Sequence, residues 1–173
     1  STPTNNTSGM SCYYDQRYSN GRVWVEVLAQ MQGLTYDPAK NDSFYGNYSA
    51  LLVTNLNNFS PKDAGTALVV LWINDADLVE AEYNDGTSAA EWNTDINRSQ
   101  VNHFNIIAQL YAKGVRTLVM PNAVDLSKIP LMDRSPNASF ISSMCVNYNA
   151  AFAATLNKAR ASFPGLTIYS PDF

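Results

Sequence analysis

Basic residues, cysteine and histidine are all scarce in this chain of 173 residues. It has 11 lysines and arginines against 15 acidic residues, and no basic cluster, so nucleic acid and anionic membrane surfaces are poor candidates for a partner. No apolar run is long enough to span a bilayer. The spacings of a zinc site, such as CxxC or paired Cys and His, are also lacking. We therefore expect no membrane span, no metal and no cofactor.

The two cysteines, Cys12 and Cys145, are too few for a disulfide framework. They leave two alternatives open, which are one bridge in an oxidising compartment, or one buried helical thiol and one loop thiol. Tyr, Asn, Ser and Thr are plentiful while Lys is rare, which weakly favours an exported protein. We therefore expect a secreted or periplasmic location.

The length and the 46% hydrophobic content predict one domain with a real core over residues 1–173, preceded by a flexible loop at 1–11. The stretch "SNGRVWVEVLAQMQGL" predicts a helix with Val23, Val27, Leu28 and Met31 on one face, and Gly33 suits its C-terminal cap. "SALLVTNLNNF" predicts a further short helix.

Three apolar strands are predicted beyond this point, and long helices separate them. The strands are "ALVVLWI", "RTLVM" and "LTIYS", and the helices run from about Thr94 to Lys113 and from about Ala138 to Ser162. Strands that are apolar throughout are typical of a parallel sheet that is covered on both faces. The alternation predicts an α/β fold with three layers, α/β/α, and a mostly parallel sheet.

Each predicted strand ends in polar residues, which are Asn74 and Asp75, then Asn122 and Asp125, and finally Asp172. In a parallel sheet these groups share one edge, where ligands commonly bind. Helix capping and turn formation are the alternative roles for the individual aspartates and for Asn122. Asn74 is the strongest site candidate, because an amide N–H at a strand end can stabilise a developing oxyanion by roughly 3 kcal/mol.

Several segments resemble the GDSL, or SGNH, family of esterases and lipases. "YYDQRYSNGRVWVEVLA" is similar to the stretch after that family's nucleophile loop, and "VLWINDADL" to its third block, with Trp72 where the family commonly has Gly. "GVRTLVMPNAVDL" and "YNAAFAATLNKARASFPGLTIYSPDF" resemble the elements that follow. The resemblance implies an incomplete SGNH-type, flavodoxin-like fold and the hydrolysis of a carboxylic ester of a lipid or acylated small molecule. Asn74 matches the oxyanion Asn, and Gly46 the second-block Gly whose N–H also faces the oxyanion.

The family's catalytic motifs do not occur in this sequence. There is no Gly-Asp-Ser and no Asp-x-x-His, so the resemblance implies a nucleophilic Ser and an Asp-His pair outside this chain. We expect the chain alone to hydrolyse little or no ester. We also expect it to need the remaining segments of its own domain, or another chain. His103, the only histidine, falls on an apolar helical face and is expected to be a core residue and not a base.

Two other functions remain open. The first is a non-catalytic module that binds acylated carbohydrate or lipid through an aromatic rim of Tyr13, Tyr14, Tyr18, Trp24 and Trp72. Core and helix packing is the favoured alternative role for Trp24 and Trp72, because their surroundings are apolar. The second is a nucleotide-binding domain, which ranks last because no glycine-rich phosphate loop is present.

Overall fold

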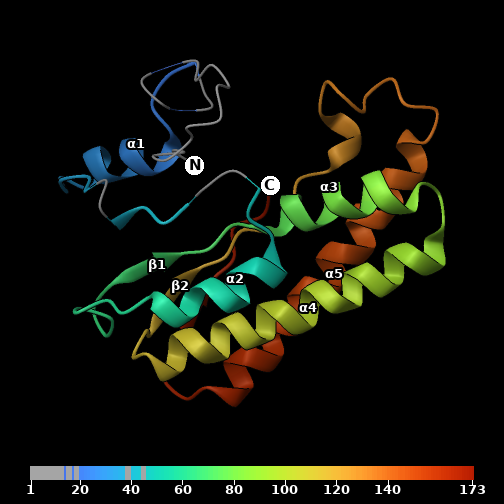
Figure 1. The fold of residues 1–173 in the computed structure, drawn as a ribbon. Coiled ribbons are helices and arrows are strands. Elements are labelled where there is room, and N and C mark those ends of the chain that lie inside the picture. The colour runs from blue at the N-terminus through green and yellow to red at the C-terminus, as the bar shows by residue number, and fades with distance from the viewer. Residues whose placement is uncertain (1–13, 15–16, 18–19, 38–39, 44–45) are drawn as a thin grey trace. The chain divides into compact units, whose positions relative to one another are not determined.

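The computed structural model describes Tyr14, Arg17 and residues 20–37, 40–43 and 46–173. The chain divides into two compact units, Ser1–Asn47 (unit 1) and Tyr48–Phe173 (unit 2) (Figure 1). The predicted loop at 1–11, the tyrosines Tyr13 and Tyr18, and Cys12 lie outside the described residues. The prediction of one domain over 1–173 remains a prediction.

Unit 2 contains a three-stranded parallel sheet in the order β1-β2-β3. The strands are β1 (Leu68–Val70), β2 (Thr117–Val119) and β3 (Thr167–Tyr169). All three are shorter than predicted, since only three residues of each strand form the backbone hydrogen bonds of the sheet. The predicted α/β class and the parallel sheet are confirmed.

The helices of unit 2 agree with the sequence-based expectation at α2 and α5 and differ from it at α3 and α4. They are α2 (Ser49–Asn55), followed by the 3-10 helix η2 (Leu56–Asn58), then α3 (Asn74–Asp85), α4 (Ala89–Ala112), the 3-10 helix η3 (Leu126–Lys128) and α5 (Ala138–Ser162). The expected bounds of α5 are confirmed, and α2 with η2 fills the expected short helix. Helix α4 begins at Ala89 and not Thr94, because the Ser88 hydroxyl caps it by accepting from the N–H of Glu91.

Helix α3 was not predicted from the sequence. Of its four buried residues, Asn74 and Asp77 are polar and Leu78 and Ala81 are apolar, so no clear apolar stripe marks the helix in the sequence. As a result, Asn74 and Asp75 form the first turn of a helix and do not lie in an extended loop.

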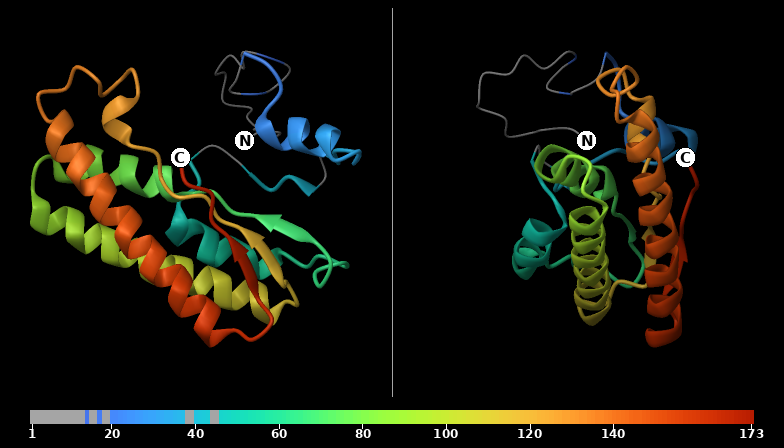
Figure 2. Two further views of the ribbon diagram at one scale, coloured as in Figure 1. Left: turned by 180° about the vertical axis from the view of Figure 1, so that it is seen from behind. Right: turned by 90° about the vertical axis from the view of Figure 1, so that its right-hand side faces the viewer.

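The core of unit 2 lies between the sheet and the helices α4 and α5, which pack side by side (Figures 1 and 2). The register aligns Val69, Leu118 and Ile168 in one row, and this row packs into the core. The neighbouring rows are more open, since Leu68 is 52% exposed and Tyr169 is 57% exposed. Unit 2 by itself therefore supplies two of the three predicted layers.

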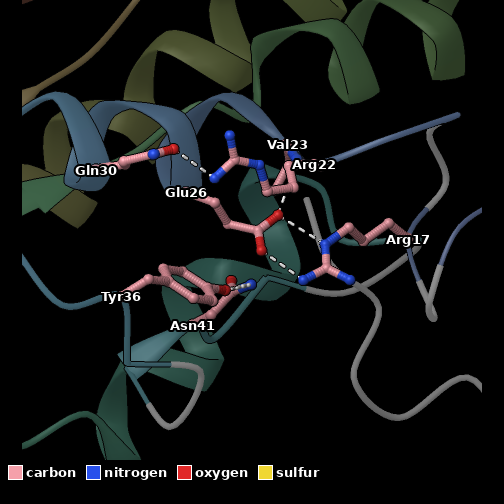
Figure 3. Close-up of polar contacts among 7 residues, drawn as sticks. All are labelled: Arg17, Arg22, Val23, Glu26, Gln30, Tyr36 and Asn41. Atoms are coloured by element: carbon pink, nitrogen blue, oxygen red, sulfur yellow. Dashed lines mark hydrogen bonds and ion pairs between the residues drawn. The ribbon is translucent and has the colours of Figure 1, made fainter.

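Unit 1 contains helix α1 (Trp24–Met31), which is shorter than the predicted segment. Its start is fixed by Glu26, whose carboxylate accepts from the N–H of Val23 at 2.9 Å and forms a two-pronged ion pair with Arg17 (Figure 3). The hydrogen bonds from Arg17 hold the pKa of Glu26 below its usual value, against the effect of burial. Gly33 has φ +66 and follows the helix, as predicted for a C-terminal cap.

The predicted apolar face of α1 is mostly uncovered. Val23 is buried, but Val27 and Leu28 are more than one-third exposed and Met31 is 76% exposed. The predicted helix is confirmed by α1.

Two further expectations concern membranes and thiols. Within the described ranges, none of the helices has the length and apolar character needed to cross a membrane. Cys145 is a free thiol buried in α5, and burial raises its pKa to about 11. This environment matches the second of the two cysteine alternatives for Cys145.

Candidate active site at the carboxyl end of the sheet

Asn74 lies at the carboxyl end of β1, at the first position of α3. Its side chain is fully buried, and Nδ2 donates to the carbonyl oxygen of Pro121 at 3.1 Å. This bond joins the end of β1 to the end of β2. The amide oxygen Oδ1 is buried without a hydrogen-bond partner in the part of the chain that the structure describes. A carboxamide has two N–H groups, so one donor of Asn74 is committed to the fold and the second is not.

Asp75 ties the start of α3 to the loop after β2. Its Oδ1 accepts from the N–H of Val124 at 3.0 Å. Burial raises the pKa of this carboxyl, and the bond from Val124 partly opposes that rise. The side chain therefore holds the first turn of α3 to the loop after β2, at the edge where the candidate site lies.

Asn122 and Asp172 meet beyond the ends of β2 and β3. The Asn122 side chain donates to the Asp172 carboxylate, and its oxygen accepts from the N–H of Phe173 at 2.9 Å. The Asn122 carbonyl oxygen also accepts from Nε1 of Trp72 at 3.1 Å. The Trp72 and Phe173 rings are stacked with centroids 5.0 Å apart. The predicted convergence of Asn74, Asn122 and Asp172 on one sheet edge is thus accompanied by a network of hydrogen bonds among the strand ends.

Asp125 is the N-cap of η3. Its Oδ1 accepts from the N–H of Ser127 at 3.0 Å, and Oδ2 accepts from the Ser142 hydroxyl of α5 at 2.8 Å. Burial alone would raise the pKa of Asp125, but the hydrogen bonds from Ser127 and Ser142 outweigh burial and lower it. Of the two roles open to Asp125 in the sequence, the capping role is the one that this geometry describes.

Asn149 was not identified from the sequence. Its side chain brackets the backbone of Ala123, with Oδ1 accepting from the Ala123 N–H at 3.0 Å and Nδ2 donating to the Ala123 carbonyl oxygen at 2.9 Å. The one signal in the sequence was its helical spacing, since it follows Cys145 by one turn and precedes Phe152 by one turn on the inward side of α5. An amide at such a position indicates a partner from another element.

Gly46, the second oxyanion candidate, belongs to unit 1, whereas Asn74 belongs to unit 2. Its φ of +77 lies in the left-handed region that favours glycine. Whether its N–H and the Asn74 amide serve one site remains a prediction.

His103 is a core residue of α4, as expected. It is fully buried, its Nδ1 donates to the carbonyl oxygen of Ser99 at 2.9 Å, and its ring meets Phe152 edge-on. Burial lowers its pKa, so the ring is neutral at pH 7. The sequence did not reveal that His103 borders a buried polar cluster with Asp77, Ser99 and Tyr148.

No protein-family model matches the chain, and no curated protein matches it either. The fold defines the class of unit 2, which is an α/β unit with a parallel sheet. Within the described residues, no group of three or more His, Cys, Asp or Glu side chains is arranged to hold a metal ion.

Proposed function

We propose that this chain carries part of the active site of a carboxylic-ester hydrolase of the GDSL/SGNH type. In this proposal Asn74 donates to the tetrahedral oxyanion, and Gly46 supplies a second N–H. The nucleophilic Ser and the Asp-His pair are contributed by residues outside this chain. The reaction is attack of the Ser hydroxyl on the ester carbonyl, with the His accepting the proton.

The support for the proposal is the fixed position of the Asn-Asp turn at the carboxyl end of a parallel sheet. The Pro121 carbonyl holds the amide of Asn74, and the Val124 N–H holds the carboxylate of Asp75. A donor that is fixed before the reaction costs no reorganisation when negative charge develops. The second N–H of Asn74 is the group available for this role.

The proposal makes one structural demand. Asn74 is fully buried here, so an ester oxygen reaches its free N–H only when the covering groups move or differ in the complete domain. An amide that stays inaccessible to substrate would remove the chemical basis of the proposal within this chain.

The test is hydrolysis of p-nitrophenyl acetate by two polypeptides. The 173-residue chain is expected to show only background turnover. A polypeptide extended by its flanking coding sequence is expected to be active. In that active protein, Asn74→Ala should lower kcat by about 100- to 1,000-fold, the usual effect of removing one oxyanion donor. Asn147→Ala, at an exposed position of α5, is the matched control, and equal loss in both variants would contradict the role of Asn74.

A specific observation also favours the second candidate, a module that binds acylated carbohydrate. At the same sheet edge, Phe173 is 66% exposed and stacks on Trp72, with the amide and carboxylate of Asn122 and Asp172 alongside. An aromatic face beside polar side chains suits a sugar ring. Saturable binding of an acetylated oligosaccharide that Trp72→Ala abolishes, without ester turnover by the extended polypeptide, would favour this candidate over the hydrolase.

A further inference from the structure

Unit 2 contains a cavity of about 220 Å³ among its helices, away from the residues named for the ester site. The start of α2, one side of α3 and the middle of α4 form its walls. None of the strand-end residues Asn74, Asp75 or Asn122 is among the residues that line it. The cavity is therefore a separate feature and needs its own explanation.

A buried carboxylate lies in the wall of this cavity. Asp77 is only 9% exposed, and its Oδ1 accepts from the N–H of Ser49 at 2.8 Å. Its Oδ2 accepts from the hydroxyl of Ser99, which also lines the cavity. The Ser49 hydroxyl accepts in turn from Nδ2 of Asn102 at 3.0 Å. Hydrogen bonds donated to a carboxylate are stronger than those between neutral groups.

The groups behind Asp77 fix the direction of these hydrogen bonds. The Tyr148 hydroxyl lies 2.8 Å from Ser99 Oγ, and burial raises the pKa of Tyr148, so the phenol keeps its proton. Since Ser99 gives its own proton to Asp77, the Tyr148 O–H donates to Ser99. This chain of donors points toward Asp77 and supplies no positive charge to it.

The charge around the cavity is unbalanced. Glu80 and Asp95 also line it, and its one lining cation, Arg98, pairs with Asp95 at 2.9 Å. Asp77 takes part in none of the ion pairs found among the described residues. A carboxylate taken out of water without a cation is costly, even with hydroxyl and amide donors.

Asp85, at the end of α3, does not line the cavity, but it interacts with Asp95, which does. Among the described residues, Oδ2 of Asp85 is buried without a hydrogen-bond partner. Burial and repulsion from Asp95 and Glu91 raise the pKa of Asp85, which reflects crowding of negative charge at this end of α3 and α4. A positive charge bound in the cavity would compensate the carboxylate of Asp77 and reduce the excess of negative charge among the lining residues.

We propose that the cavity binds a small organic cation, with a primary ammonium group on the Asp77 carboxylate and further contact to Glu80. An ammonium has three donors, and the cavity presents carboxylate and hydroxyl oxygens as acceptors. Anionic ligands are disfavoured by three lining carboxylates against one arginine. A metal ion is disfavoured because the described residues hold no grouping of three or more suitable ligands.

The test uses the full 173-residue chain and three probes. Ethanolamine is the ammonium probe, 1,2-ethanediol is its neutral counterpart of similar size, and magnesium chloride is the metal probe. The readout is the NMR shift of the Ser49 backbone N–H, because this group donates directly to Asp77. We expect a saturable shift with ethanolamine and none with the other two probes. An equal shift with the diol, or a saturable shift with magnesium only, would overturn the proposal.

Two variants and one control locate the ligand. Asp77→Asn keeps the side-chain shape and removes the charge, and Glu80→Gln does the same at a half-exposed position of the cavity wall. Each should weaken ethanolamine binding by about tenfold or more. Glu82→Gln makes the same charge change on α3 outside the cavity lining, and should change the affinity by less than about twofold. If Asp77→Asn does not fold, unchanged affinity in Glu80→Gln still overturns the proposal.

Discussion

The first turns of α3 present polar groups to two different surroundings, and the contrast separates fold-holding residues from ligand candidates. Toward the strand ends, the carboxylate of Asp75 accepts a hydrogen bond from the backbone N–H of Val124. The carboxylate of Asp125, the N-cap of η3, accepts one from the backbone N–H of Ser127 in the same way. Toward the cavity, Asp77 is hydrogen-bonded but its charge has no cation among the described residues. A polar side chain at a strand end is thus weak evidence for a ligand site when its hydrogen bonds all go to other residues of the protein. A carboxylate beside a cavity with no cation to pair with is stronger evidence.

The largest expected effect comes from removing the buried carboxylate on the cavity side. Asp77→Ala leaves the Ser49 N–H and the Ser99 hydroxyl without their acceptor, and both residues are buried from solvent. We expect the free energy of unfolding to fall by about 3 kcal/mol, the upper range for hydrogen bonds to a charged group. Urea denaturation at pH 7 measures this change.

Glu82→Ala is the control for this prediction, since it shortens a partly exposed acidic side chain on the same helix and should cost less than about 0.5 kcal/mol. If Asp77→Ala costs no more than this control, Asp77 is not the organising group of the cluster, and the contrast between the two sides of α3 is wrong.

The strand-end side has its own fold-holding residue in Asn149. Asn149→Ala removes both hydrogen bonds to the Ala123 backbone, and Ala123 is fully buried. We expect a loss of about 2 kcal/mol, less than for Asp77 because no charge is involved. Asn147→Ala, at an exposed position of the same helix, should be nearly neutral. Thermal or urea unfolding measures the change in stability of each variant. Equal changes in the two would show that the loop after β2 does not depend on the hydrogen bonds of the Asn149 side chain.

The pH dependence of stability probes the inner edge of the cavity cluster. Burial depresses the pKa of His103 in the folded protein below the ordinary value of 6.5. Below pH 6.5 the unfolded chain therefore takes up a proton that the folded chain does not, and stability falls as the pH is lowered. The slope from this one group approaches about 1.4 kcal/mol per pH unit between about pH 6 and the depressed folded pKa.

His103→Gln tests this directly, because His103 is the only histidine in the sequence. The variant is expected to be less stable at pH 7 and to lose less stability on acidification than the original chain. The measurement is urea unfolding at about pH 7, 6 and 5 for both proteins. Parallel stability curves would mean that His103 is protonated in the folded state as readily as in the unfolded one.

The sequence predicted the parallel sheet, α5 and the buried state of His103, because continuous apolar strands and helical periodicity report burial directly. It missed α3, whose buried face is half polar, since Asn74 and Asp77 satisfy partners that come from distant segments. The same cause hid Asn149 and the cavity cluster. Hydrogen bonds between residues 22 to 49 positions apart leave no local pattern in a sequence. Asn74 was correctly placed at the strand end, but its burial depends on packing that no motif records.

The smallest effect is expected at the outer rim of the strand ends. Asn122→Ala removes the side-chain bonds to Asp172 and to the Phe173 N–H, which lie in exposed surroundings. The backbone bonds of residue 122 to Trp72 and Pro171 do not involve the side chain and persist. Because water replaces exposed hydrogen bonds at little cost, the free energy of unfolding should change by about 0.5 kcal/mol or less.

Urea unfolding of Asn122→Ala beside Asn149→Ala measures the difference between the rim and the interior of one loop. A loss at Asn122 as large as that at Asn149 would mean that the rim network is part of the fold. The polar side chains of the rim would then be weak candidates for binding a substrate, because their hydrogen bonds would be needed to hold the strand ends together.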